Sequence, residues 1–126
     1  MSGAVEPALE VGLELPARSY GAVGRLVAAG VASRLGATVD RIDELQLALD
    51  TALRRTVQGG EVVLRLRPSD DALNVVVGPM SIPDEERADL ERVLSALVEG
   101  VSTYEADGEV WIDLRVAVEP LASASR

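Results

Sequence analysis

Asp50 and Arg54 are the residues whose types and spacing could most directly do chemistry in this sequence. They lie in LQLALDTALRRTVQGG, from Leu45 to Gly60, where the apolar spacing predicts an amphipathic helix that ends at two glycines. A separation of four residues places both side chains on one face of that helix. The plainest interpretation is a surface ion pair, which would stabilise the helix by about 0.2–0.5 kcal/mol.

Other groups of reactive residues have simpler structural explanations. The sequence contains no His and no Cys, so the usual general base and zinc–thiolate sites are missing. Without an activating His or Lys, the hydroxyl groups of the serines are not expected to act as nucleophiles. These serines are Ser19, Ser33, Ser81 and Ser95. The acidic clusters 40–44 and 84–86 fall at predicted helix starts, where negative charge offsets the helix dipole.

The charged residues are strongly unbalanced toward acid. The sequence has 12 basic residues, all of them Arg, and 21 acidic residues, for a formal charge of −9. This charge argues against binding to nucleic acid or to an anionic membrane, and it favours a protein partner with a basic patch. Neither a secretion signal nor a run of about 18 apolar residues occurs. We therefore expect a cytoplasmic protein.

The length and composition predict one compact domain with an aliphatic core. A chain of 126 residues lies in the usual range of single domains. Hydrophobic residues make up 48% of the sequence but aromatic residues only 2%, and Phe is missing, so Val, Leu, Ile and Ala must fill the core. We expect a single domain over 1–126, with its core at about 8–118 and frayed termini.

The first half of the sequence predicts one strand and two helices. Alternation over 8–15 is typical of a strand with one buried face, and spacings of three and four residues over 18–36 predict a helix. The expected buried positions of this first helix are Val23, Leu26, Val27, Val31 and Leu35. A second helix is expected from a cap at Thr38 or Asp40 to about Gln58. Its expected buried stripe is Ile42, Leu45, Leu49, Ala52, Leu53 and Thr56.

The second half predicts two hairpins on either side of a third helix. Strands are expected at 61–68 and 72–78, and two more within 101–118 around an Asp107–Gly108 turn. The intervening helix falls within 81–100, with Ser81 and Asp84 as capping candidates. Its expected buried face consists of Leu90, Val93, Leu94, Leu97 and Val98. Trp111 alternates with apolar neighbours in the last strand, so we expect it to be packed rather than to bind a ligand. This order predicts an α+β two-layer sandwich, with the helices on one face of a mostly antiparallel sheet.

Four segments carry a resemblance to a known family: RLVAAGVASRLGATVDRIDELQLALDTALRRTV, VVLRLRP, ALNVVVG and DGEVWIDLRV. Together they are similar to the RsbW-like anti-sigma-factor serine kinases of the GHKL, or histidine-kinase-like, ATPase superfamily. The resemblance spans most of the chain. It implies the Bergerat-type fold of that superfamily, which agrees with the α+β sandwich predicted from the pattern.

The resemblance gives Asp50 and Arg54 a second interpretation. In the family, the second helix carries an acidic residue that positions a water, and four residues later an Asn that holds magnesium. The acidic position falls on Asp50 here and the Asn position on Arg54. A guanidinium has five donors, no acceptor and a permanent charge, so Arg54 cannot replace a magnesium ligand. We hypothesise that Arg54 instead acts as a built-in cation that pairs with Asp50.

Two further motifs of the family are also altered. The family has an Asp-x-Gly-x-Gly turn after the third strand, whereas the corresponding NVVVGPMSIPDEE retains only Gly78, followed by Pro79. A flexible glycine-rich lid would follow, but ADLERVLSALV predicts continuous helix. These three differences predict a degenerate ATP site at Asp50, Arg54 and Gly78, with no catalytic residue, no cofactor and no metal.

The resemblance therefore implies a regulatory binding protein rather than an enzyme. Such a protein would sequester a sigma factor or a STAS-domain anti-anti-sigma partner without phosphorylating it. Two alternatives stay open: an active serine kinase that uses ATP and magnesium, and a sensory or scaffold module that uses the emptied pocket for another ligand. The resemblance also suggests a homodimer.

Overall fold

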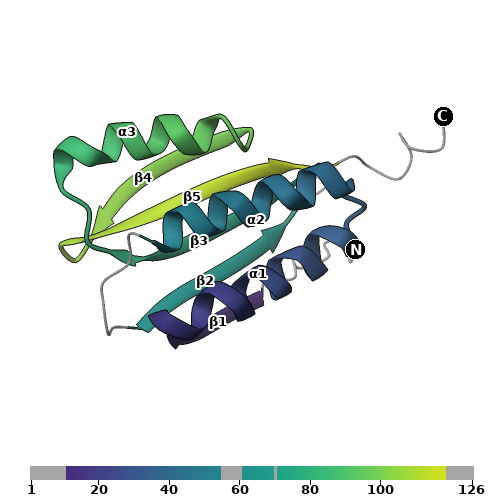
Figure 1. The fold of residues 1–126 in the computed structure, drawn as a ribbon, viewed down its shortest axis with the longest axis horizontal. Helices are drawn as coiled ribbons and strands as arrows, with labels where there is room; N and C mark the ends of the chain where they lie inside the picture. Colours follow the sequence, from purple (N-terminus) through teal and green to yellow (C-terminus); the bar gives the residue numbers. More distant parts are fainter. Residues whose placement is uncertain (1–10, 55–60, 70, 119–126) are drawn as a thin grey trace, which may run out of the picture.

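A computed structural model describes residues 11–54, 61–69 and 71–118 of the chain. Three helices and five strands follow one another in the predicted order (Figure 1). In chain order they are β1 (Val11–Pro16), α1 (Ala17–Arg34), α2 (Val39–Leu53), β2 (Glu61–Pro68), β3 (Ala72–Met80), α3 (Asp84–Ser95), β4 (Gly100–Ala106) and β5 (Glu109–Ala117). Residues 8–10 of the predicted first strand and 55–58 of the predicted second helix lie outside the described residues.

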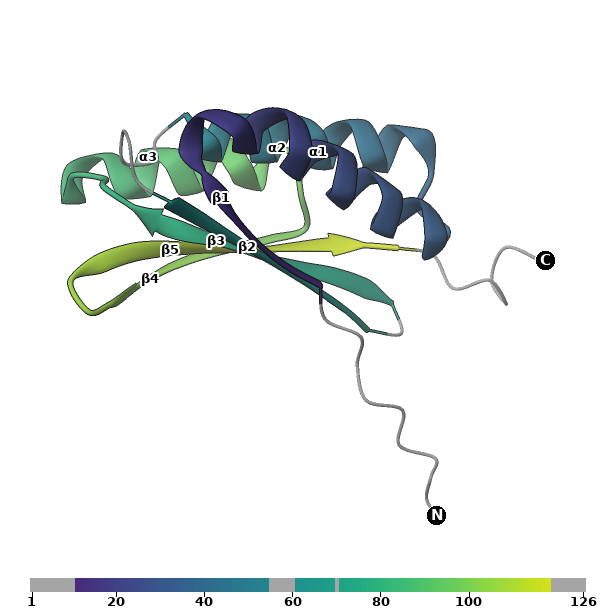
Figure 2. The same ribbon diagram turned by 90° about the horizontal axis from the view of Figure 1, so that it is seen from below.

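The strands form one antiparallel sheet in the order β1-β2-β3-β5-β4. The three helices lie together on one face of this sheet, and none of the residues that the structure describes forms a helix on the other face (Figure 2). Asp107 and Gly108 both have positive φ, 57° and 80°, so they form the predicted tight turn between β4 and β5. The predicted α+β class, with helices on one face of the sheet, is confirmed.

The core lies between the helices and the sheet and is built from aliphatic side chains. Alternate residues of β2, β3 and β5 point into it, as the pleat requires. These residues are Val62, Leu64, Leu66, Leu73, Val75, Val77, Val110, Ile112, Leu114 and Val116. Fully burying a side chain of the size of Val, Leu or Ile contributes about 1.5–3 kcal/mol, so this one layer supplies much of the driving force for folding.

Helix α1 buries a different face from the one that its large apolar residues predicted. Val23 is 40% exposed and Leu26 is 72% exposed, so the prediction that both face the core was wrong. The fully buried positions are instead Ala28 and Ala32, while Gly24, one turn earlier, is also buried. Small residues spaced by four form a narrow stripe that lets a helix approach its neighbours closely, so the larger side chains are displaced to the edge and to solvent. The residues Val27, Val31 and Leu35 pack at that edge, partly buried.

Helix α2 follows the prediction closely in its described part. Thr38 is the N-cap, and its hydroxyl oxygen accepts a hydrogen bond from the backbone N–H of Arg41 at 3.2 Å. Leu45, Leu49 and Ala52 are fully buried, as expected, and Ala48 joins them. Ile42 and Leu53 are partly buried against this cluster. Thr56, the last residue of the predicted stripe, lies outside the described residues.

Helix α3 is shorter than predicted and begins without a side-chain cap. Its N-cap is Pro83, so neither Ser81 nor Asp84 has the predicted capping role. Three acidic residues in the first turn compensate, because negative charge there stabilises the helix dipole. The helix ends at Ser95, and Val93 is 44% exposed, so its predicted place on the buried face was wrong. Leu90 and Leu94, one turn apart, are the buried residues of the helix. Val93 lies at the margin of the face that these two leucines form.

Polar contacts attach α3 and the start of α2 to the sheet. Arg87 of α3 donates from Nη1 to Glu105 at 3.1 Å and from Nη2 to the hydroxyl of Thr103 at 3.0 Å, both in the edge strand β4. Arg41 of α2 pairs with Glu99, whose other carboxylate oxygen accepts the backbone N–H of Ala117 at 2.9 Å. These bonds connect the helix layer to the sheet on the side of β4 and β5.

Gly78 lies inside β3, at a β-bulge. The strand continues to Met80 rather than ending at Gly78, and its register against β5 shifts between Val77 and Met80, so that Gly78 and Pro79 lie opposite Trp111. A Cβ atom at position 78 would lie 2.7 Å from Cδ2 and Cε3 of Trp111. The indole therefore covers the glycine on the helix-free face, and only glycine leaves room for it. This contact agrees with the expectation that Trp111 is packed.

None of the helices within the described residues is long and apolar enough to cross a membrane.

We expect Leu49→Ala to lower the free energy of unfolding by about 2–5 kcal/mol, because it leaves a cavity in the core. Leu47→Ala is the matched control: the same atoms are removed from the same helix, but Leu47 is 52% exposed, so a change within about 0.5 kcal/mol is expected. Urea denaturation followed by circular dichroism measures both. Equal effects of the two substitutions would contradict the placement of α2.

We expect Gly78→Ala to lower the free energy of unfolding by about 1–3 kcal/mol, because the added methyl group overlaps the Trp111 indole. Gly12→Ala in β1 is the control, since a Cβ there meets no atom within 4 Å. Thermal unfolding gives the comparison, and Trp111 emission should shift only in the Gly78 variant. A Gly78 variant as stable as the Gly12 variant would show that the indole does not cover the glycine.

Candidate functional site

Helix α2 places Asp50 and Arg54 in the helix layer, away from the sheet. Its buried stripe consists of Leu45, Ala48, Leu49 and Ala52. Asp50 is only partly buried beside this stripe, and Arg54 is the C-cap residue of the helix. Both side chains therefore lie near the carboxyl end of α2, the first at its margin and the second in solvent.

The two side chains form the ion pair that their spacing predicts. Nη2 of Arg54 donates a hydrogen bond to Oδ2 of Asp50 at 2.9 Å, and the backbone N–H of Arg54 donates to the Asp50 carbonyl at 3.2 Å. The Arg54 side chain is 74% exposed and the Asp50 side chain 34% exposed. An ion pair this open to water contributes about 0–1 kcal/mol. The guanidinium also lies at the negative end of the helix dipole, which adds a small favourable term.

The ligand chemistry of this pair is poor for a divalent cation. One oxygen of Asp50 already accepts from Arg54, and the guanidinium itself offers no acceptor. Magnesium requires six oxygen ligands in near-octahedral geometry, and proteins usually supply one or two carboxylates in addition to phosphate oxygens. No group of three or more acidic residues that could hold a metal occurs among the described residues.

Gly78 is not brought together with this pair. The register places Gly78 opposite Val63 near the start of β2, at the end of the molecule where α2 also terminates (Figure 1). The position where a Gly78 side chain would lie is, however, covered by Trp111 on the helix-free face, whereas Asp50 and Arg54 belong to the helix layer. The three residues named from the sequence therefore share one end of the fold but lie on two sides of the sheet.

The connection from β3 to α3 is short. Only Ser81, Ile82 and Pro83 separate the two elements, and Ile82 is buried. The helix then runs without interruption from Asp84 to Ser95. The described chain thus has three non-glycine residues and a continuous helix where the resemblance implies a glycine-rich lid.

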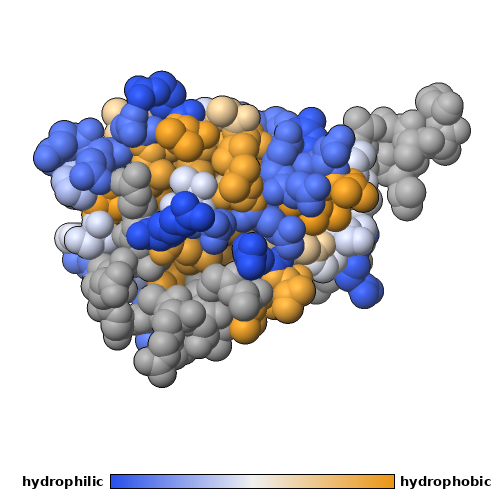
Figure 3. Space-filling model, in the orientation of Figure 1, coloured by the Kyte–Doolittle hydropathy of each residue, from blue (hydrophilic) through white to orange (hydrophobic). Residues whose placement is uncertain are grey.

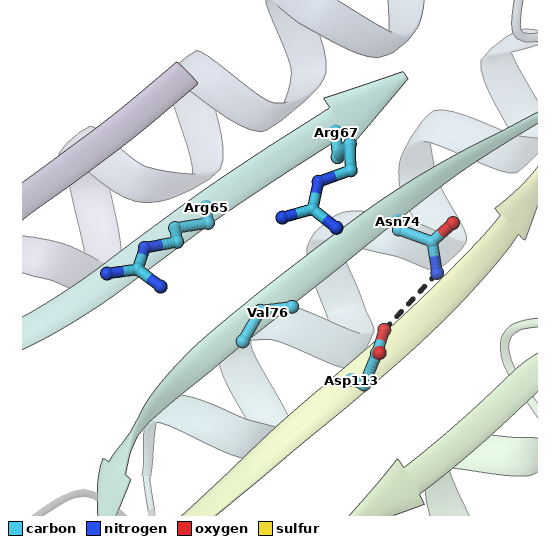
Figure 4. A pocket seen from close by; sticks show the side chains of 5 residues that line it. All are labelled: Arg65, Arg67, Asn74, Val76 and Asp113. Carbon is cyan, nitrogen blue, oxygen red and sulfur yellow. Dashed lines mark hydrogen bonds between the residues drawn. The ribbon is translucent and has the colours of Figure 1, made fainter. Parts of the chain in front are cut away.

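The sequence did not single out a polar cluster on the helix-free face. A shallow hollow of about 210 Å³ lies there, lined by Arg65 and Arg67 of β2, Asn74 and Val76 of β3, and Asp113 of β5 (Figure 4). Nδ2 of Asn74 donates to Oδ1 of Asp113 at 3.3 Å. The alternation of Leu and Arg in VLRLR predicts one polar face of the strand, but the partners from β3 and β5 depend on the sheet register.

Comparisons with known proteins relate only part of the chain to proteins of named activity. No model of a protein family matches the sequence. The serine-protein kinase RsbW of Bacillus subtilis (strain 168) is 37% identical over 73 aligned residues, which cover 52% of this chain and 46% of that protein. The RsbW of Bacillus velezensis gives the same identity and coverage. The chain thus spans about half the length of the relatives it matches. This partial homology supports a relationship to RsbW-like serine-protein kinases.

Proposed function

We propose that this chain is a regulatory protein-binding domain that works as an anti-sigma factor. In this proposal it sequesters a sigma factor, or a STAS-domain antagonist, in the cytoplasm and without ATP-dependent phosphorylation. The partial homology to serine-protein kinases named RsbW supports the family relationship. The observation that carries the loss of kinase activity is Arg54, paired with Asp50 at 2.9 Å where the family places a magnesium-binding amide.

Arg54 opposes magnesium binding because it lacks a ligand atom, and not because its ion pair with Asp50 is strong. An exposed pair is worth about 0–1 kcal/mol, so magnesium could displace it at little cost. Arg54 cannot replace the lost amide oxygen, because a guanidinium has only hydrogen-bond donors and no acceptor atom. A cation near Asp50 would also be repelled by the permanent charge of Arg54. The short connection between β3 and α3, which stands in place of a glycine-rich lid, likewise supports the proposed loss of phosphate binding.

The helix layer offers a surface suited to a protein partner. Leu26, Leu47 and Val93, one from each helix, are 72%, 52% and 44% exposed. Seen from this side, apolar and strongly polar residues alternate over the surface (Figure 3). Exposed apolar side chains are typical of a protein interface, and the charge of −9 on the whole chain would speed encounter with a basic partner.

An active serine kinase is the second candidate, favoured because the RsbW relatives are named serine-protein kinases. It requires magnesium-dependent binding of ATP at Asp50 despite Arg54. A sensory or scaffold module with an emptied pocket is the third. The hollow on the helix-free face gives this third candidate no support, since it does not lie between the helices and the sheet.

We expect no saturable heat when magnesium and ATP are titrated into the protein in a calorimeter, and no rise in melting temperature. Arg54→Asn should behave in the same way, because the single substitution restores the amide but not the glycine turn or the lid. Arg54→Ala controls for loss of the charge alone. Magnesium-dependent ATP binding by the original protein would establish the kinase candidate, and binding gained by Arg54→Asn would show that Arg54 alone closes the site.

We expect the protein to form a complex with a sigma factor or a STAS-domain protein of its source organism, in the absence of ATP. Surface plasmon resonance against each candidate measures this. The association rate should fall about tenfold or more as salt rises from about 50 to 500 mM, because acidic charge steers the encounter. Failure to bind every sigma factor and STAS protein of that organism would exclude the proposed function.

A further inference from the structure

Strand β4 forms one edge of the sheet and leaves one side of its backbone open (Figure 1). It pairs with β5 along its whole length, from Gly100 opposite Arg115 to Ala106 opposite Glu109. Among the described residues, no other strand pairs with β4, and no hydrogen bond from a turn or loop reaches its backbone. A strand directs its N–H and C=O groups alternately to its two sides, so about half of these groups in β4 are available to a further strand.

The features that usually protect an edge strand are weak in β4. The strand contains no Pro, its register against β5 is continuous without a bulge, and Glu105 is its one charged residue. Every residue from Ser102 onward except Thr103 is exposed, and the Tyr104 side chain is 44% exposed. Val101 and Thr103 are β-branched, which favours the extended backbone that a neighbouring strand needs.

The surroundings of β4 are acidic. Arg87 is the one basic residue in the strand, in its turn to β5 and on the side of α3 that contacts the strand. Nη1 of Arg87 lies 3.1 Å from Oε2 of Glu105 and 3.8 Å from Oδ1 of Asp84, and Nη2 donates to the Thr103 hydroxyl at 3.0 Å. The Thr103 hydroxyl donates in turn to Glu91. The carboxylates around Arg87 therefore outnumber it; they are Asp84, Glu91, Glu105, Asp107 and Glu109.

The open edge and these carboxylates together define what can bind. An edge strand accepts a partner in extended conformation, because only that conformation presents N–H and C=O groups at the matching interval. The excess of carboxylates favours basic side chains in the partner. We propose that β4 is a docking edge for an extended basic segment of a partner protein, which adds to the sheet beside Thr103, Tyr104 and Glu105. Arg115 lies opposite Gly100 at the other end of β4 and pairs with Asp71 at 3.5 Å.

This docking edge is separate from the surface in the proposed function. That surface consists of exposed apolar side chains on the three helices, whereas β4 offers backbone groups at the margin of the sheet. Docking at β4 does not rest on anti-sigma activity, because it depends only on the strand and the charges around it. A synthetic peptide can therefore test the edge even if no sigma factor or STAS-domain protein binds.

The probe is a blocked peptide of about seven residues in which Arg and Val alternate, so that its extended form matches the length of β4. Trp111 reports binding, since it is the one tryptophan of the chain and lies opposite Tyr104. We expect a saturable change in Trp111 emission. Methylation of one alternate set of peptide amides should weaken binding about tenfold or more, because those N–H groups bond to β4. Methylation of the other set, which faces away from β4, should leave the affinity within about threefold.

Variants test the choice of a basic partner. Glu105→Gln should weaken binding of the Arg–Val peptide by about threefold or more, because it removes a carboxylate beside the incoming strand but keeps an acceptor for Arg87. Asp43→Asn is the matched control: it removes the same charge at an exposed residue of α2 and should leave the affinity within about twofold. A peptide with Glu in place of Arg should not saturate. Unchanged melting temperatures would show that both variants fold.

Several outcomes would overturn this proposal. Equal affinities of the two methylated peptides would exclude addition of a strand. Equal weakening by Glu105→Gln and Asp43→Asn would show a general effect of net charge, and equal binding of the Glu peptide would remove the preference for a basic segment. If sedimentation shows a dimer that the Arg–Val peptide dissociates, the occupant of the edge is a second copy of this chain. No change in Trp111 emission together with no heat in calorimetry would exclude the docking edge.

Discussion

The close approach of two alanine-lined helices to an aliphatic sheet is the contact on which the other features depend. With no Phe in the sequence, the core gains its volume from Leu, Val and Ile of the strands, and Ala28, Ala32, Ala48 and Ala52 of α1 and α2 are fully buried in the same core. Packing at this density leaves no room for polar groups, and within the described residues no polar or charged side chain is buried. The charged residues are therefore divided between the outer side of the helices and the open side of the sheet. Both the Asp50–Arg54 pair and the polar cluster around Arg65 and Asp113 follow from that division.

The two charged features differ in what they can bind because they differ in geometry rather than in charge. Asp50 and Arg54 satisfy each other at 2.9 Å, and neither contributes a free set of oxygen ligands. Arg65 and Arg67 belong to one strand, where the pleat keeps like charges parallel and apart. Asp50 and Arg54 therefore satisfy each other, whereas Arg65 forms no ion pair with any residue that the structure describes.

The parts of the fold that the sequence predicts well are those with one dominant local signal. The Asp107–Gly108 turn has residues that tolerate positive φ, and α2 has both a cap at Thr38 and an unbroken apolar stripe. The buried faces of α1 and α3 were predicted less well. Large apolar residues such as Leu26 and Val93 are more hydrophobic than alanine, so a hydrophobic pattern assigns them to the core first. Their actual orientation depends on how closely the helices approach, which is a tertiary property. The polar cluster on the helix-free face was missed for a related reason, since Asn74 and Asp113 meet Arg65 and Arg67 only through strand register.

The division of the molecule into a helix layer and an open sheet face has a consequence for communication between them. A partner bound on one side cannot touch a partner on the other, because the whole sheet separates them (Figure 2). Any cooperativity between two occupants would have to pass along the strands, where Val75 and Val77 face the core and Val76 between them faces outward. A small rotation of β3 would shift all three together. The backbone of one strand is thus the shortest mechanical path between the two surfaces, and its stiffness sets how independently they act.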